Sequence, residues 1–141
     1  RVYSIERGRS DRIDVFKEGA DLGNPNGLLF NPRSKNLLVV TWKGQIIEID
    51  RLGRVRVLKK DLSTLDGVDH DGKGAIYVSS FEKGEIYRIE YYGRGQMKTV
   101  VNGLTTPADI SYDRQADELL VPSFNSGTVT TIPAKKKNVN T

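Results

Sequence analysis

Short stretches in which apolar and polar residues alternate fill most of the chain, and Gly-rich turns separate them. A period of two is typical of strands that turn one face toward a core. The clearest series consists of four such stretches: residues 67–70, 75–80, 85–90 and 97–101. No segment keeps a helical period for more than about two turns. The pattern therefore predicts an all-β chain.

The same series of strands and turns occurs three times along the chain. Asn26, Asp66 and Asp109 occupy equivalent positions, 40 and 43 residues apart. The turn glycines keep the same two spacings: Gly44, Gly84 and Gly127. Four short antiparallel strands in about 40 residues are the size of one β-propeller blade. We expect β-propeller blades of four antiparallel strands, about three blades' worth.

A partial propeller over residues 1–134 is the expected domain. Its parts are the two outer strands of one blade (1–19), two complete blades (20–61 and 62–103), the three inner strands of a last blade (104–133) and a basic tail (135–141). A three-blade arc leaves sheet edges open, and open edges favour pairing with another chain segment. The expected partner is the missing propeller half, on a longer polypeptide, or a second copy of this chain.

Composition excludes several classes of protein. With 141 residues, 37% hydrophobic and 28% charged, the chain is expected to fold as one globular domain. There are no cysteines, which excludes disulfides and thiolate metal sites. Its apolar runs reach about five residues, against roughly 20 needed to cross a bilayer. We expect a soluble chain with no membrane partner; its compartment stays open, with the periplasm and secretion both considered.

Charge argues against a nucleic-acid partner. The net charge is +4, from 22 Lys and Arg against 18 Asp and Glu, and both signs are interspersed outside the C-terminal tail. A nucleic-acid-binding domain would more often carry a basic stripe with interleaved aromatic residues. We therefore expect no nucleic-acid partner.

The motifs NPNGLLF, LDGVDHDGKGAIYVSSFEKGEIYRI and TPADISYDRQADELLVPSF resemble the senescence marker protein/gluconolactonase family of six-bladed β-propellers, which is similar in shape to NHL-repeat propellers. The resemblance covers nearly the whole chain and matches the C-terminal half of the family. It implies metal-dependent hydrolysis of lactones or esters. In the family's hydrolases an Asn of the Pro-Asn-Gly segment, an Asp of the next blade and a Glu nearer the N-terminus hold a divalent metal.

Asn26 and Asp66 match the first two of these ligands. An amide oxygen and a carboxylate are hard donors suited to Ca²⁺, Mg²⁺ or Mn²⁺. Ca²⁺ is the expected ion, with Mg²⁺, Mn²⁺ or Zn²⁺ as alternatives. Asn26 could instead cap its own turn, as Asn beside Pro and Gly often does, and the same alternative stands for Asp66. Asp109 is the weaker candidate: it could be a third ligand, or it could tie adjacent blades through backbone N–H groups.

The remaining candidates have structural alternatives as well. His70, the only histidine, aligns with turn residues of the other repeats, so we expect no catalytic role for it. Trp42, Phe81 and Phe124 end the second strands of their repeats, where they either pack between blades or stack against a ligand. The sequence thus leaves two functions open. One is a metal-dependent lactonase or esterase, and the other is a non-catalytic propeller that binds a protein or small ligand on its rim.

Overall fold

The computed structural model describes residues 1–134, and the basic tail at residues 135–141 lies outside this part. It confirms the all-β prediction. A two-stranded hairpin comes first: β1 (Val2–Glu6) and β2 (Arg9–Lys17). A short 3-10 turn, η1 (Ala20–Leu22), leads into the first four-stranded sheet. Its strands are β3 (Pro25–Phe30), β4 (Leu37–Thr41), β5 (Ile46–Ile49) and β6 (Val55–Lys59).

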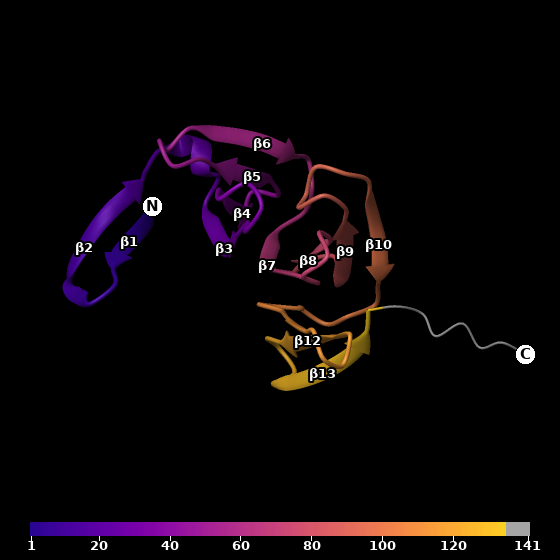
Figure 1. The fold of residues 1–141 in the computed structure, drawn as a ribbon. Helices are drawn as coiled ribbons and strands as arrows, with labels where there is room; N and C mark the ends of the chain where they lie inside the picture. Colours follow the sequence, from indigo (N-terminus) through magenta and orange to yellow (C-terminus); the bar gives the residue numbers. More distant parts are fainter. Residues whose placement is uncertain (135–141) are drawn as a thin grey trace, which may run out of the picture.

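The second half repeats this order. The next sheet consists of β7 (Leu65–His70), β8 (Ile76–Ser80), β9 (Glu85–Ile89) and β10 (Met97–Val101). The last described sheet has three strands: β11 (Ser111–Asp113), β12 (Glu118–Ser123) and β13 (Thr128–Pro133). Every sheet is antiparallel with its strands in chain order. The sheets follow one another around an arc, with β3 and β7 toward its centre and β6 and β10 on its outside (Figure 1). This is the arrangement of propeller blades.

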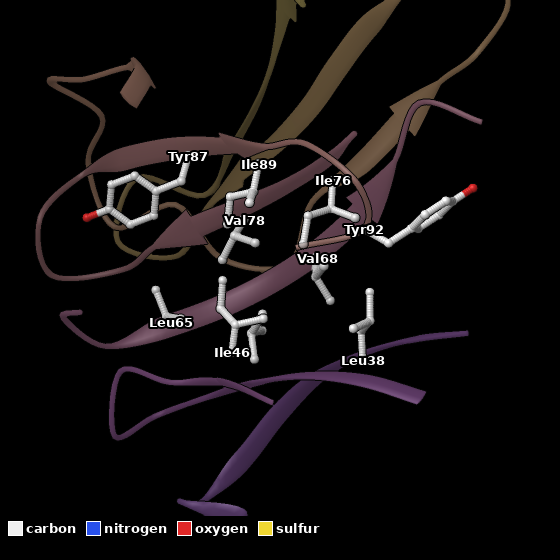
Figure 2. Packing of buried hydrophobic residues seen from close by; sticks show 10 residues of the cluster. Leu38, Ile46, Leu65, Val68, Ile76, Val78, Tyr87, Ile89 and Tyr92 are labelled. Carbon is white, nitrogen blue, oxygen red and sulfur yellow. The ribbon is translucent and has the colours of Figure 1, made fainter. Parts of the chain in front are cut away.

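The hydrophobic cores lie between the blades. Figure 2 shows Leu38 and Ile46 of one blade facing Leu65, Val68 and Val78 of the next. A second cluster joins that blade to the last one, and a third joins the hairpin to the first complete blade. The runs on β4, β5 and β8 are buried along almost their whole length because both faces of these strands meet a neighbouring sheet. Within residues 1–134 no helix is long and apolar enough to cross a membrane.

Within residues 1–134, apolar and hydrogen-bonding surface stays open at both ends of the arc. β13 pairs with β12 on one side, and Val129 on it is 70% exposed. The hairpin at the other end exposes four large apolar side chains: Tyr3, Ile5, Ile13 and Val15. An unpaired strand edge is a template for pairing with another strand, and an isolated two-stranded hairpin is marginal in water.

We therefore expect the 141-residue chain to associate in solution through these ends. Val129→Lys places a charge on the open strand and should shift the population toward monomer, as measured by light scattering. The matched control is Val100→Lys, on the outer strand of a complete blade, where Val100 is 38% exposed. A well-folded monomer at all concentrations would contradict the expectation, as would an equal effect of the two substitutions.

Candidate functional site

Asn26 and Asp66 each lie in an irregularity of an inner strand. On β3 the pairing passes from Pro25 opposite Thr41 to Leu28 opposite Val39, and on β7 it shifts in the same way around Asp66 and Gly67. In both strands two residues stand opposite one on the partner, which is the geometry of a β-bulge. A bulge re-aims side chains relative to the regular alternation of the strand. The repeated Asn-Gly and Asp-Gly steps therefore set two polar side chains in equivalent, irregular positions.

The glycine of each step allows the inner strands to approach one another. A Cβ on Gly27 would lie 2.5 Å from the carbonyl oxygen of Asp66, and one on Gly67 would lie 2.7 Å from the Cα of Asp109. Any side chain at either position would overlap backbone atoms of the following blade. The close approach brings Asn26 next to Asp66, and Asp66 next to Asp109.

Asp66 interacts with each of the other two predicted ligand residues. The Asn26 Nδ2 lies 3.5 Å from the Leu65 carbonyl oxygen, and the Asn26 amide also donates to the Asp66 carboxylate. Burial raises the pKa of the Asp66 carboxyl, and the charge of Asp109 raises it further, while the hydrogen bond from Asn26 acts in the opposite direction. Asp66 is half-buried, whereas Asn26 and Asp109 are exposed.

This site has unbalanced negative charge. Neither Asp66 nor Asp109 forms an ion pair with a residue of the described chain. Because the Asn26 amide donates through its nitrogen, its Oδ1 can accept a hydrogen bond or bind a metal ion. One amide oxygen and two carboxylates are donors suited to a hard divalent cation. Within residues 1–134 no group of three or more His, Cys, Asp or Glu is arranged to hold a metal ion.

Blades are tied together by residues that the sequence did not single out. Asp69 accepts a hydrogen bond from the Tyr112 N–H at 2.7 Å, across to the next inner strand. Ser79 Oγ accepts from the Gly67 N–H at 2.8 Å and donates to the Ala108 carbonyl at 2.7 Å. One role expected for Asp109 was to tie adjacent blades through backbone N–H groups. Asp69 makes a contact of this kind. Only the folded arrangement reveals this, since Asp69 is one of several acidic residues near a turn.

The aromatic residues form a row along the same end of the blades. The ring centroids of Trp42 and Phe81 are 5.5 Å apart, and those of Phe81 and Phe124 are 5.9 Å apart. The backbone N–H of each donates to a carbonyl just before the inner strand of its own blade, as from Trp42 to Asn24 at 2.8 Å. Trp42 is 44% exposed and Phe124 is 74% exposed. The rings thus contact each other across blades and also present an apolar surface beside the Asn26 site.

His70 lies at the opposite end of its strand. Its Nδ1 accepts a hydrogen bond from the Gly72 N–H at 3.0 Å, and its ring lies 5.8 Å from that of Tyr92. Burial lowers the pKa of the imidazole, and the nearby Arg114 lowers it further. His70 is the last residue of β7, directly before the turn to β8.

The fold is similar to that of solved lyase structures. A streptogramin B lyase matches with a TM-score of 0.62 and 14% identity, over 93% of this chain and 47% of that chain. A virginiamycin B lyase from Staphylococcus aureus gives 0.57 and 14%, over 81% and 42%. A catalytically inactive form of the S. aureus enzyme with quinupristin gives 0.54 and 16%, over 83% and 43%. At these identities the similarity shows the β-propeller fold alone, and this chain spans less than half the length of those structures.

The sequence matches no protein-family model and no curated protein. The structural similarity nevertheless confirms the β-propeller part of the sequence-based prediction. The narrower resemblance to the gluconolactonase family stays a prediction. The likeness to NHL-repeat propellers and the assignments of calcium binding and hydrolase activity stay predictions as well.

Gly67→Ala should destabilise the fold because the added methyl group overlaps backbone of the next blade. We expect a loss of about 1–3 kcal/mol in the free energy of unfolding, measured by urea denaturation. Gly103→Ala is the control: Gly103 is left-handed at φ 72°, with no neighbouring atom within 4 Å of the added Cβ, so it reports backbone strain without a clash. A Gly67→Ala protein as stable as the parent would contradict the close approach of the strands.

Asp66→Asn should raise the melting temperature at neutral pH. Because the folded-state pKa of Asp66 is raised, the folded protein loses stability as pH rises through the ordinary carboxyl range toward that pKa. The gain in melting temperature of the Asp66→Asn variant should be present at about pH 7.5. It should shrink toward about pH 3.5, because the Asp66 carboxyl of the parent is then protonated in the folded and unfolded states. Differential scanning fluorimetry across this range measures it, with Asp11→Asn, an exposed carboxylate on β2, as the control. A gain that does not change with pH would disprove the electrostatic origin.

Proposed function

We propose that this chain supplies the ligand face of a β-propeller, and that Asn26, Asp66 and Asp109 bind a divalent metal that serves the hydrolysis of a lactone or ester. The observation that supports this most is the pair of carboxylates held side by side without a balancing cation in the described chain. Such an arrangement costs stability and is typical of functional sites. The chain covers less than half of the similar structures, so further ligands from other segments belong to the proposal.

The donor set fits a hard cation, with Ca²⁺ favoured. The Asn26 amide orients the Asp66 carboxylate through its nitrogen and offers its oxygen to the site. A bound divalent cation would polarise a carbonyl oxygen and lower the pKa of bound water. The aromatic row would receive the apolar part of the substrate, since its rings continue from the same end of the inner strands.

A non-catalytic binding role is the second candidate. Two observations favour it: the described residues contain no group of three acidic or His side chains arranged for a metal, and the exposed aromatic row is a binding surface that needs no cation. The similar structures carry names of lyases, so propellers of this shape include enzymes, but at 14–16% identity their reaction does not transfer to this chain.

Asn26→Ala and Asp66→Ala should each weaken divalent-metal binding by about tenfold or more, because each removes one oxygen donor from a small set. Isothermal titration with Ca²⁺, Mg²⁺, Mn²⁺ and Zn²⁺ measures the affinities, and circular dichroism checks that the β fold is intact. Asp11→Asn, which removes a distant carboxylate, should leave the affinity unchanged. Unchanged affinity in both alanine variants would disprove the metal assignment.

The two candidate functions separate in one further assay. A panel of lactones and aryl esters is incubated with the metal-loaded protein and with Asp66→Ala, and acid release is followed by pH-stat titration. Metal-dependent turnover that is lost in the variant supports the hydrolase. Saturable binding without turnover, lost in Trp42→Ala but retained in Asp66→Ala, supports the binding module.

A further inference from the structure

A cavity lies at the end of the blades opposite the Asn26 site. It has a volume of about 300 Å³, and its lining residues are Asn31, Arg33, Ser34, Tyr91, Tyr92 and Arg94. The first three belong to the β3–β4 turn and the last three to the β9–β10 turn of the next blade. Asn26 lies near the start of β3 and Asn31 directly follows its end, so this cavity is separate from the candidate metal site.

The repeat is broken at this cavity. Five residues separate β5 from β6, but seven separate β9 from β10. Tyr91 and Tyr92, in the longer turn, are both left-handed, with φ values of 51° and 50°. This conformation is unfavourable for residues with a bulky side chain, and it is held here by a hydrogen bond from the Tyr92 N–H to the Gly74 carbonyl at 2.8 Å. The longer turn places one exposed tyrosine ring and one buried ring beside the cavity.

The equivalent arginines of the two blades have different partners. Arg54, in the shorter turn, pairs with Asp50 of its own turn at 2.6 Å. Arg94 instead reaches the preceding blade, where its Nη2 donates to both carboxylate oxygens of Glu48 at 2.9 and 2.7 Å. The Glu48 side chain is only 4% exposed, while that of Arg94 is 46% exposed. The ion pair fixes the Arg94 guanidinium at the cavity wall and leaves its other N–H groups available.

Two further groups offer hydrogen-bond donors to the cavity. Asn31 is 3% exposed, and its Oδ1 accepts from the N–H groups of Arg33 and Ser34 at 3.0 and 3.3 Å. No described residue accepts from its Nδ2. The guanidinium of Arg33 lies 6.0 Å from the Tyr92 ring centroid and forms no ion pair within residues 1–134. Because Glu48 balances Arg94, the lining carries one net positive charge, that of Arg33.

We propose that this cavity binds a small organic oxyanion, a phosphate monoester or a carboxylate, carried on a flat ring. Guanidinium groups are the preferred partners of both oxyanions, and the Asn31 amide adds a donor that is already oriented by its own turn. Tyr91, 70% exposed, provides a flat apolar surface for the ring. The arrangement needs no metal and does not depend on the proposed hydrolase activity.

The test is an NMR titration of the full ¹⁵N-labelled chain with phenyl phosphate, benzoate and inorganic phosphate. With at least one aryl oxyanion, we expect saturable shifts confined to the amides of residues 31–34 and 90–96. Arg33→Gln should weaken binding by about tenfold or more, since it removes a charge-assisted hydrogen bond. Asn31→Asp keeps the oxygen that caps the turn but replaces the amide donor with a carboxylate, and should weaken binding as well.

Lys73→Gln is the matched control. Lys73 is exposed at the third position of the β7–β8 turn, the place that Arg33 takes in the β3–β4 turn, so its loss changes the net charge equally. It should change the affinity by less than about twofold, in keeping with a screened surface charge. Equal weakening by Lys73→Gln and Arg33→Gln would overturn the proposal, as would shifts spread over the surface or no saturable binding of either aryl oxyanion. Inorganic phosphate bound as tightly as phenyl phosphate would overturn the ring contact with Tyr91.

Discussion

Neighbouring blades depend on one another because no single blade can bury its own apolar faces. A four-stranded sheet has two faces, and here both are covered only where another sheet lies on each side. The cluster around Leu38, Ile46 and Val78 therefore belongs to two blades at once. Burial of each such side chain contributes roughly 1.5–3 kcal/mol, and that contribution exists only while the blades stay in contact. The open ends of the arc follow from the same constraint.

Close contact between blades also creates the two polar sites. At one end, glycines without side chains let the inner strands meet, and the carboxylates of Asp66 and Asp109 are brought together despite their like charge. At the other end, Arg94 reaches across the boundary between the two four-stranded blades to Glu48. The Arg33 cavity is built from turns of two consecutive blades, and the Asn26 site from the inner segments of three, so the geometry of each is set by how the blades pack.

The sequence predicted what repeats along the chain. Strand periodicity and the spacing of Asn26, Asp66 and Asp109 were enough for the fold class and for the expectation that these residues are equivalent. The contacts made by Asp69, Ser79 and Glu48 could not be predicted, because each depends on which atoms of the next blade lie opposite. The Tyr91 turn was also missed: it departs from the repeat, and its glycines are typical of an ordinary turn.

Trp42 is the only tryptophan of the protein, and it lies in the aromatic row beside Asn26. The cavity at the opposite end of the blades is lined by tyrosines and contains no indole. Intrinsic emission excited at the red edge of the protein absorption band will therefore come from one face of the molecule alone. The chain carries a built-in spectroscopic label that distinguishes a ligand arriving at the inner-strand site from one arriving at the Arg33 cavity.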